Sequence, residues 1–292
     1  MTTPAEPPTA APTEPPRTVT PDTPEAPPAE AIEEAAPAAR ESARWRPRVA
    51  IGVVILGLVV SQAVALGIMF AAGGEDASDA AVAGAFVLAD LLLVAIIVAF
   101  ASRGAERLTG ATLGVRRTPF WRAVGWTLAI WIGILTLEGL YALLVGGFSN
   151  VEEDAGITDG EMVLILFAVA VITPIAEELA FRGYLFPALT RWRGPWIGAL
   201  VTALIFGAAH VASSPVLAVP ALALFGFGAC MLFWFTGSLL PCVGLHAANN
   251  ALVMSVGGAW TWQVLVAVIG CVALSVLLML PFARERAPYA AA

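Results

Sequence analysis

The sequence predicts an all-α fold, a polytopic membrane helix bundle of about eight transmembrane helices with a disordered N-terminal tail. Two observations predict it. Of the 292 residues, 59% are hydrophobic and only 13% are charged, whereas an ordinary soluble domain is about 25% charged. In addition, apolar stretches of about 20 residues, the length that crosses a bilayer, recur from residue 48 onward. We therefore expect an integral membrane protein.

The tail covers residues 1–45 and is rich in Pro, Ala and Glu, with almost no large apolar side chain. Such a segment cannot bury enough surface to offset the entropy of ordering it. It also lacks the basic start, apolar centre and small-residue cleavage site of a secretory signal. We expect a disordered tail followed by an uncleaved transmembrane anchor.

The apolar segments give the expected spans in chain order. They are residues 48–72, 80–101, 120–146, 161–190, 195–212, 215–236, 239–257 and 260–282. The first three fall within residues 46–146, and the last lies within residues 260–292, ahead of a short C-terminal tail.

Arginine placement predicts the orientation, because short cytoplasmic loops carry the excess of basic residues. Arginines precede the first span, lie between the second and third, and follow the fourth and the eighth, whereas loops 73–79 and 150–161 contain none. Both termini are therefore predicted to be cytoplasmic, and we expect the membrane to be a bacterial cell membrane. Tryptophans fit interfacial belts near both surfaces: Trp45, Trp121, Trp192 and Trp196 on one side, Trp260 and Trp262 on the other.

Polar residues in three of the apolar spans form the candidate site. Ionised side chains at bilayer depth cost a few kcal/mol, so they usually face a partner, a cavity or a substrate path. Residues four apart share a helical face. The pairs with this spacing are Glu178 with Arg182, Phe206 with His210, and His246 with Asn250, and Glu177 precedes the first pair.

Helical rise predicts that the first two pairs meet. At 1.5 Å per residue, Glu177 lies about 20 Å before the turn "RWRGP" and His210 about 22 Å after it, so an antiparallel hairpin places them at one level. His246 lies only about 10 Å from the start of its span. The levels agree if the fourth and fifth helices project beyond the membrane surface, which predicts a cytoplasm-facing cavity.

These residue types support two hydrolytic mechanisms. In the first, two histidine nitrogens and a carboxylate hold Zn²⁺ with an open position for water, which gives Glu177, His210 and His246 as candidate metal ligands. In the second, Glu177 takes a proton from water while His210 positions that water. In either, Asn250, with or without His246, donates to the developing oxyanion. Arg182 neutralises Glu178 and leaves Glu177 free.

Structural interpretations compete with these roles. In these interpretations the two glutamates and Arg182 form a buried ion cluster, and the histidines are satisfied interior residues. Asn249 and Asn250 join helices by hydrogen bonds. Two carboxylates against one arginine leave a charge unmatched, which favours a further partner such as a metal ion or a proton. Asp90 and Glu138 are further intramembrane acids without a motif.

Three short motifs carry a resemblance to a known family. They are "EELAFR" at 177–182, "FGAAH" at 206–210 and "HAANN" at 246–250, each on its own apolar span. In this order they resemble the CPBP family of intramembrane metalloproteases, which includes the CaaX prenyl endopeptidases of the Rce1 type and relatives labelled Abi or lysostaphin-resistance-like. The resemblance covers about residues 160–260, the expected catalytic core.

The resemblance implies an intramembrane endopeptidase. It implies that Glu177 activates water beside His210, that His246 and Asn250 complete the site as a metal ligand or oxyanion stabilisers, and that zinc is the cofactor. The expected partners are a membrane-embedded or membrane-associated protein or peptide substrate and the lipid bilayer, with no nucleic acid. The alternatives are a proton-coupled transporter and a catalytically silent scaffold or immunity protein.

Overall fold

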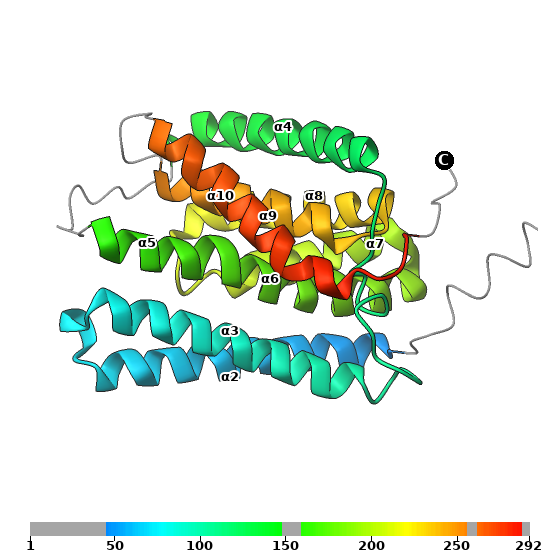
Figure 1. The fold of residues 1–292 in the computed structure, drawn as a ribbon, viewed down its shortest axis with the longest axis horizontal. Helices are drawn as coiled ribbons and strands as arrows, with labels where there is room; N and C mark the ends of the chain where they lie inside the picture. Colours follow the sequence, from blue (N-terminus) through cyan, green and yellow to red (C-terminus); the bar gives the residue numbers. More distant parts are fainter. Residues whose placement is uncertain (1–44, 148–158, 256–261, 288–292) are drawn as a thin grey trace, which may run out of the picture. The chain divides into compact units, whose positions relative to one another are not determined.

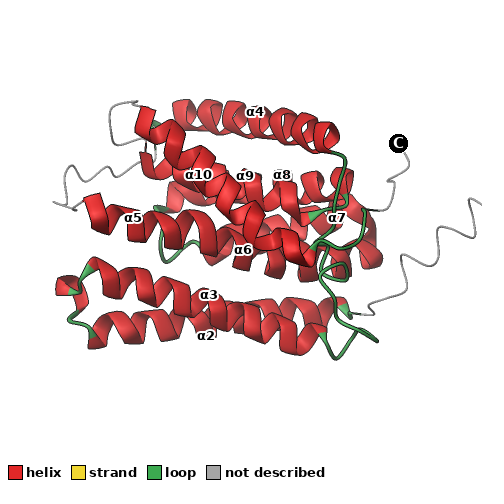
Figure 2. Ribbon diagram, viewed as in Figure 1, coloured by secondary structure: helices red, strands yellow, loops and turns green. Residues whose placement is uncertain are grey.

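The computed structural model describes residues 45–147, 159–255 and 262–287, and all of the predicted tail except its last residue, Trp45, lies outside this part of the chain. Within the described residues every regular element is a helix and no strand is present (Figure 2). The prediction of an all-α membrane bundle is confirmed, and the chain is an integral membrane protein.

The helices follow one another in a simple order. They are α2 (Pro47–Ala71), η1 (Gly74–Asp76), α3 (Asp79–Ala101), α4 (Phe120–Val145), α5 (Asp159–Phe167), η2 (Ala168–Ile172), α6 (Thr173–Glu178), η3 (Leu179–Leu185), α7 (Phe186–Ala209), η4 (Val216–Ala218), α8 (Val219–Thr236), α9 (Leu239–Ser255), α10 (Trp262–Met279) and η5 (Leu280–Phe282). The segments η2 and η3 are π-helical, and η1, η4 and η5 are 3₁₀ turns.

The eight expected spans correspond to eight apolar segments, but two of these are shorter than expected. Six helices in the described residues are long and apolar enough to cross a membrane, and one of them, Val163–Ala209, combines the fourth and fifth expected spans. Its backbone breaks at Arg193 and Gly194, where Gly194 adopts a φ of 79° that glycine tolerates best. The part after the break ends at Ala209, and Leu239–Met254 is also a shorter apolar helix.

The helix that carries both glutamates lies in the middle of the bundle. Figure 1 shows α5 and α6 between the α2–α3 pair and the helices α9 and α10. The segments η2, α6 and η3 contact α3 and α9, while α7 packs along α8. In contrast, α4 packs on α8 and α9 and has only Ile134 buried. The central position of α6 places its carboxylates within reach of several helices.

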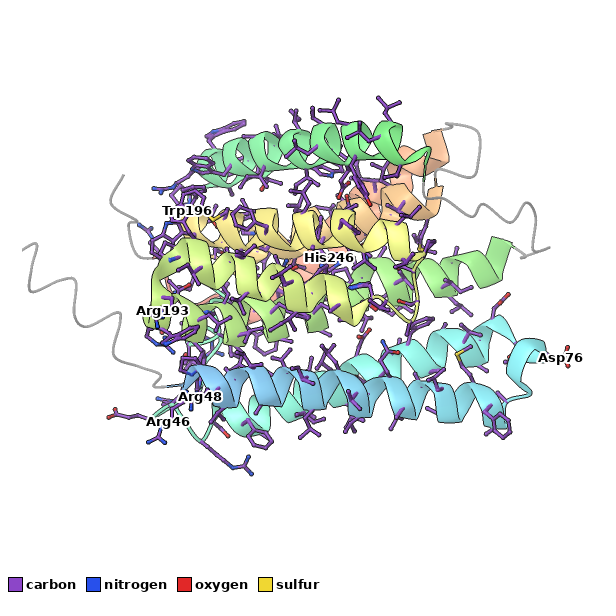
Figure 3. The ribbon with its side chains drawn as sticks, turned by 180° about the vertical axis from the view of Figure 1, so that it is seen from behind. Arg46, Arg48, Asp76, Arg193, Trp196 and His246 are labelled. Carbon is purple, nitrogen blue, oxygen red and sulfur yellow. The ribbon has the colours of Figure 1, made fainter. Side chains whose placement is uncertain are left out.

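The arginine-bearing ends of the helices lie together. Figure 3 shows Arg48, Arg193 and Trp196 at one end of the bundle, Asp76 at the other, and His246 between them. The predicted orientation requires that these arginines lie at a common end of the bundle. Which side of the membrane these ends face stays a prediction.

One of the predicted belt tryptophans is a core residue instead. Trp45 is only 6% exposed, because its ring packs on Tyr184 with centroids 4.8 Å apart and its Nε1 donates to the Ala101 carbonyl at 3.0 Å. Trp121 and Trp196 are exposed, as an interfacial belt requires. Trp260 and the side chain of Trp262 lie outside the described part of the chain.

Candidate functional site

Helix α6 is a six-residue α-helical stretch between two π-helical segments. The N–H of Thr173 donates to Ala168 O, five residues back, which is the π-helical register. Pro174 follows and has no N–H to donate, so the regular ladder is interrupted one turn before Glu177. Short π segments in α-helices often occur at functional sites.

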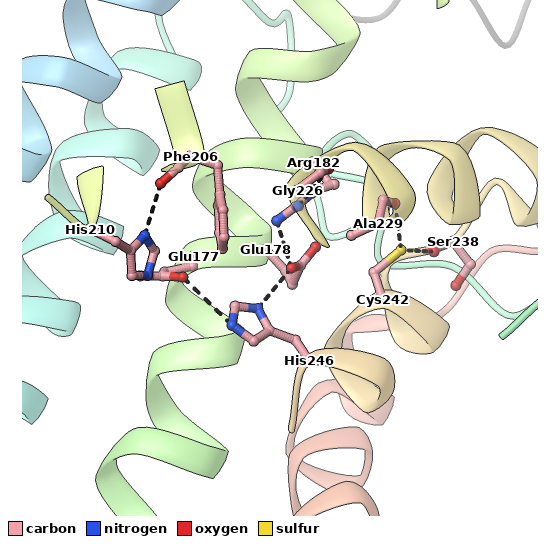
Figure 4. Close-up of polar contacts among 10 residues, drawn as sticks. All are labelled: Glu177, Glu178, Arg182, Phe206, His210, Gly226, Ala229, Ser238, Cys242 and His246. Carbon is pink, nitrogen blue, oxygen red and sulfur yellow. Dashed lines mark hydrogen bonds and ion pairs between the residues drawn. The ribbon is translucent and has the colours of Figure 1, made fainter. Parts of the chain in front are cut away.

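Glu178 is the buried centre of a three-residue polar network, drawn in Figure 4. Its Oε1 accepts from Arg182 Nη1 at 2.7 Å and from His246 Nδ1 at 2.9 Å. The Glu178 and Arg182 side chains are both 0% exposed. Arg182 Nη2 also donates to the carbonyl of Gly226 at 2.9 Å. The expected pairing of Arg182 with Glu178 is therefore present, and it extends to His246.

Gly226 is a contributor that the sequence motifs do not include. A Cβ at this position would lie 3.2 Å from both Ala203 Cα and Phe206 Cβ, tighter than ordinary contacts. The absence of a side chain lets α8 approach α7 closely enough for its carbonyl to accept from Arg182. The glycine-rich run "LFGFGAC" was the only sequence signal for it.

Glu177 lies between two imidazole rings. Its Oε1 is 3.9 Å from His210 Nε2 and its Oε2 is 3.7 Å from His246 Nε2. Both distances exceed the range of a direct hydrogen bond, and a water molecule is the usual bridge at such separations. The Oε2 atom is buried without a hydrogen-bond partner among the described residues. Side-chain exposure is 23% for His210, 13% for Glu177 and 4% for His246, so the site is open on the His210 side.

The other ring nitrogens determine what these histidines present to Glu177. His210 Nδ1 lies 2.8 Å from the carbonyl oxygen of Phe206, which can only accept, so Nδ1 is the donor. His246 Nδ1 donates in the same way to the Glu178 carboxylate, which also accepts from Arg182. When the rings are neutral, both Nε2 atoms therefore carry lone pairs toward Glu177.

His210 is the C-terminal cap residue of α7 and not part of the regular helix. The expected span 195–212 placed it inside the helix instead. The N–H groups of Ser213 and Ser214 donate back to the His210 carbonyl at 3.1 and 2.9 Å and start the turn that follows. The helix ends here because this turn takes over the carbonyl. The end position explains why His210 is the most exposed of the three side chains.

Phe206 covers the network with its ring. Its centroid lies 4.8 Å from His210 and 5.9 Å from His246, and the Arg182 guanidinium carbon is 4.8 Å from it. The residue is 1% exposed. The ring of Phe206 therefore supports His210 by packing, and its backbone carbonyl orients the same histidine.

Asn250 holds α9 against the interrupted helix that contains α6. Its Nδ2 donates to the carbonyl of Val169 at 2.8 Å. In the π register set by Thr173, this is the carbonyl to which the missing N–H of Pro174 would donate, so Asn250 supplies the donor that proline lacks. Its neighbour Asn249 accepts from Trp131 Nε1 at 3.3 Å and joins α9 to α4.

Glu177, His210 and His246 have the donor atoms of a zinc site but not its arrangement. Tetrahedral ligands about 2.0–2.1 Å from zinc lie about 3.3 Å from each other, and the two nitrogen–oxygen separations of 3.9 and 3.7 Å are wider. Within the described residues no group of three or more His, Cys, Asp and Glu side chains is placed to hold a metal ion. The expected zinc site is therefore supported by residue types alone.

Comparison with known proteins finds a family match in the central part of the chain. Residues 159–252 match the family described as Type II CAAX prenyl endopeptidase Rce1-like. The chain is also similar to an uncharacterized 24.3 kDa protein of Escherichia coli, 30% identical over 138 residues. The match covers 46% of this chain and 62% of that protein, so the chain spans less than two thirds of its relative. No solved structure matches the chain.

Proposed function

We propose, from the premise that residues 159–252 belong to the Rce1-like family, a family of membrane proteases, that this chain is an intramembrane endopeptidase. Its substrate would be a peptide bond of a membrane-embedded or membrane-associated protein, near the cytoplasmic face. One observation carries the proposal: the Glu177 carboxylate lies 3.9 and 3.7 Å from two imidazole Nε2 atoms, too far for direct bonds and near enough for one water to bridge.

The attacking water belongs between Glu177 Oε1 and His210 Nε2, on the open side of the site. Both atoms accept, so the water directs a hydrogen at each and its oxygen lone pair is left for the substrate carbonyl carbon. His210 is kept in the tautomer that allows this by its bond to the Phe206 carbonyl. This role explains why an imidazole lies at the end of a helix, where its side chain is only partly exposed.

The reaction then balances with Glu177 as the only proton carrier. The water oxygen bonds to the carbonyl carbon and its proton passes to Glu177, which gives a tetrahedral intermediate with an anionic oxygen. When the carbon–nitrogen bond breaks, the same proton passes from Glu177 to the leaving amine. Glu177 is thereby regenerated as a carboxylate, and the products are an acid and an amine.

His246 is assigned a different role because a carboxylate lies behind it. Glu177, Glu178 and Arg182 together carry one net negative charge, and a proton on His246 balances it. Glu178 stabilises such an imidazolium through Nδ1, so that Nε2–H can donate to the anionic oxygen of the intermediate. A carboxylate that orients and stabilises a catalytic imidazolium is the arrangement of the Ser-His-Asp triad.

Zinc is the competing way to balance the same charge. If bound, it would be held by Glu177, His210 and His246 and would supply an activated water and a Lewis acid. The ligand distances are wider than such a site needs, so no step of the proposed reaction passes through a metal ion.

The test is a comparison of protein termini in host membranes. A strain lacking the chain is complemented with wild type, with Glu177→Gln or with Glu138→Gln, a matched control that makes the same change on α4. We expect new termini with wild type and Glu138→Gln that are absent with Glu177→Gln at equal protein level. Identical termini in all three strains, across several growth conditions, would overturn the proposal.

A further inference from the structure

Asp90 connects a helix outside the matched family region to the catalytic helix. It lies in the middle of α3 and is only 9% exposed. Its Oδ2 accepts a hydrogen bond of 2.6 Å from the hydroxyl of Thr173. A buried carboxylate at this depth is costly and is retained where it has a function. The family match begins at residue 159 and therefore assigns nothing to Asp90.

Thr173 stands where the catalytic helix most needs support. It is the first residue of α6, its own N–H still follows the π register, and the next residue is Pro174. The backbone ladder is weak at this point, because proline donates no hydrogen bond. Glu177 follows Thr173 by four residues, so both side chains project from the same helical face.

The charge of Asp90 does not explain its presence, but the hydrogen bond does. Any charge on the Asp90 carboxyl would disfavour a charge on Glu177, because like charges repel. A direct electrostatic contribution of Asp90 would therefore oppose an ionised Glu177. In contrast, the bond to Thr173 fixes the rotation and height of the first turn of α6 against α3.

We propose that Asp90 is a positioning residue for Glu177: it holds the Thr173 hydroxyl, and thereby sets where the catalytic carboxylate lies relative to His210 and His246. The inference rests on the proposed function. It makes α3 part of the catalytic machinery, although α3 contributes no side chain to the reacting atoms. Small displacements of a positioned group lower a rate by factors of about 10².

The experiment measures kcat and KM separately in the purified full-length chain reconstituted in liposomes. The probe is a synthetic peptide that spans a junction found in the terminus comparison. Thr173→Val removes the hydroxyl at nearly constant volume, and Thr173→Ser keeps it. Asp90→Ala removes the acceptor, and Asp90→Asn keeps one. Thr136→Val is the matched control, because the Thr136 hydroxyl donates to the Ile132 carbonyl of its own helix.

We expect Thr173→Val and Asp90→Ala to lower kcat at least about tenfold with KM within about twofold, because geometry is lost and substrate contacts are not. Thr173→Ser and Asp90→Asn should stay within about threefold of wild type. The double variant Thr173→Val/Asp90→Ala should be no slower than the slower single variant, because both remove one interaction. The unfolding midpoint of Thr173→Val, at least, should match that of the control Thr136→Val.

Other results would overturn the inference. These are a Thr173→Val rate equal to that of Thr136→Val, an effect on KM alone, or losses that multiply in the double variant. If the wild type and Glu177→Gln cleave the probe equally, the proposed function has failed. If they differ while the Asp90 and Thr173 variants behave as wild type, only the positioning role has failed.

Discussion

Arg182 and Glu178 form an ion pair of 2.7 Å in which neither side chain has any exposed surface. The same Glu178 oxygen accepts from His246 at 2.9 Å. The Glu178 carboxylate thus connects Arg182, a fully buried cation, to His246. His246 is the imidazole that we propose donates to the anionic oxygen of the intermediate. Because the pair lies behind the site and not in it, its contributions to folding and to catalysis can be measured separately.

Removing Arg182 alone should destabilise the chain strongly. Arg182→Met leaves Glu178 as an unpaired buried charge, and breaking a buried pair in this way costs about 3–5 kcal/mol. The double variant Glu178→Gln/Arg182→Met removes both charges and should recover most of the loss. Unfolding midpoints in detergent test this, with Arg122→Met, a change near the membrane surface, as the control. A double variant less stable than Arg182→Met would contradict the view that charge compensation dominates.

The two histidines should respond differently to substitutions that mimic single ring nitrogens. Gln can place an acceptor near the position of Nε2, while Asn mimics only Nδ1. At His210 we assign Nε2 the role of orienting water, so His210→Gln should retain about tenfold more activity than His210→Asn. At His246 neither amide can become a cation, so both variants should lose about 10²-fold or more, the scale of a lost oxyanion donor. Initial rates at equal protein level decide it, and equal losses at His210 would count against water orientation through Nε2.

The sequence predicted the meeting of Glu177 with His210 because both lie nearly the same number of residues from the turn "RWRGP". Helical rise converts that count into a common depth, and motif spacing places Arg182 beside Glu178. The same arithmetic could not place His246, because α9 is short and its start is fixed by a contact distant in the sequence. The N–H of Leu239, the first residue of α9, donates to Gly114 O in the loop that precedes α4.

Two features of the site could not be predicted from the sequence motifs. The π segments that flank α6 depend on hydrogen-bond register, which composition does not encode. The contact between Asp90 and Thr173 joins residues 83 positions apart, so local periodicity cannot detect it. Trp45 was misassigned to an interfacial belt for a related reason, since its partners Ala101 and Tyr184 come from distant segments.

Metal removal distinguishes between the two ways of balancing the net negative charge of the site, which are a proton on His246 and a bound zinc ion. With a proton on His246, cleavage should survive treatment with a strong zinc chelator, and the purified chain should contain well under one zinc per molecule. Elemental analysis and rates before and after chelation measure both. A stoichiometric zinc ion, with activity that disappears on chelation and returns on adding Zn²⁺, would show that Glu177, His210 and His246 close around a metal.

Asn250 and Pro174 should be energetically coupled, because Asn250 donates to the Val169 carbonyl that proline leaves without a partner. Asn250→Ala strands this carbonyl, which costs about 1–3 kcal/mol. Pro174→Ala restores a backbone N–H, so Asn250→Ala should cost less in that background, with a coupling of about 0.5–3 kcal/mol. The four unfolding midpoints of the cycle measure this coupling, and strictly additive changes would refute it.

The same cycle distinguishes two roles for Asn250. If Asn250 acts only by holding the catalytic helix, Pro174→Ala/Asn250→Ala should regain activity together with stability. If the second N–H of its amide donates to the anionic intermediate, the double variant should regain stability while its rate stays about 10²-fold low. Because α9 presents His246 and Asn250 on one face, the first outcome would leave His246 as the donor to the intermediate. The second would assign both residues to it.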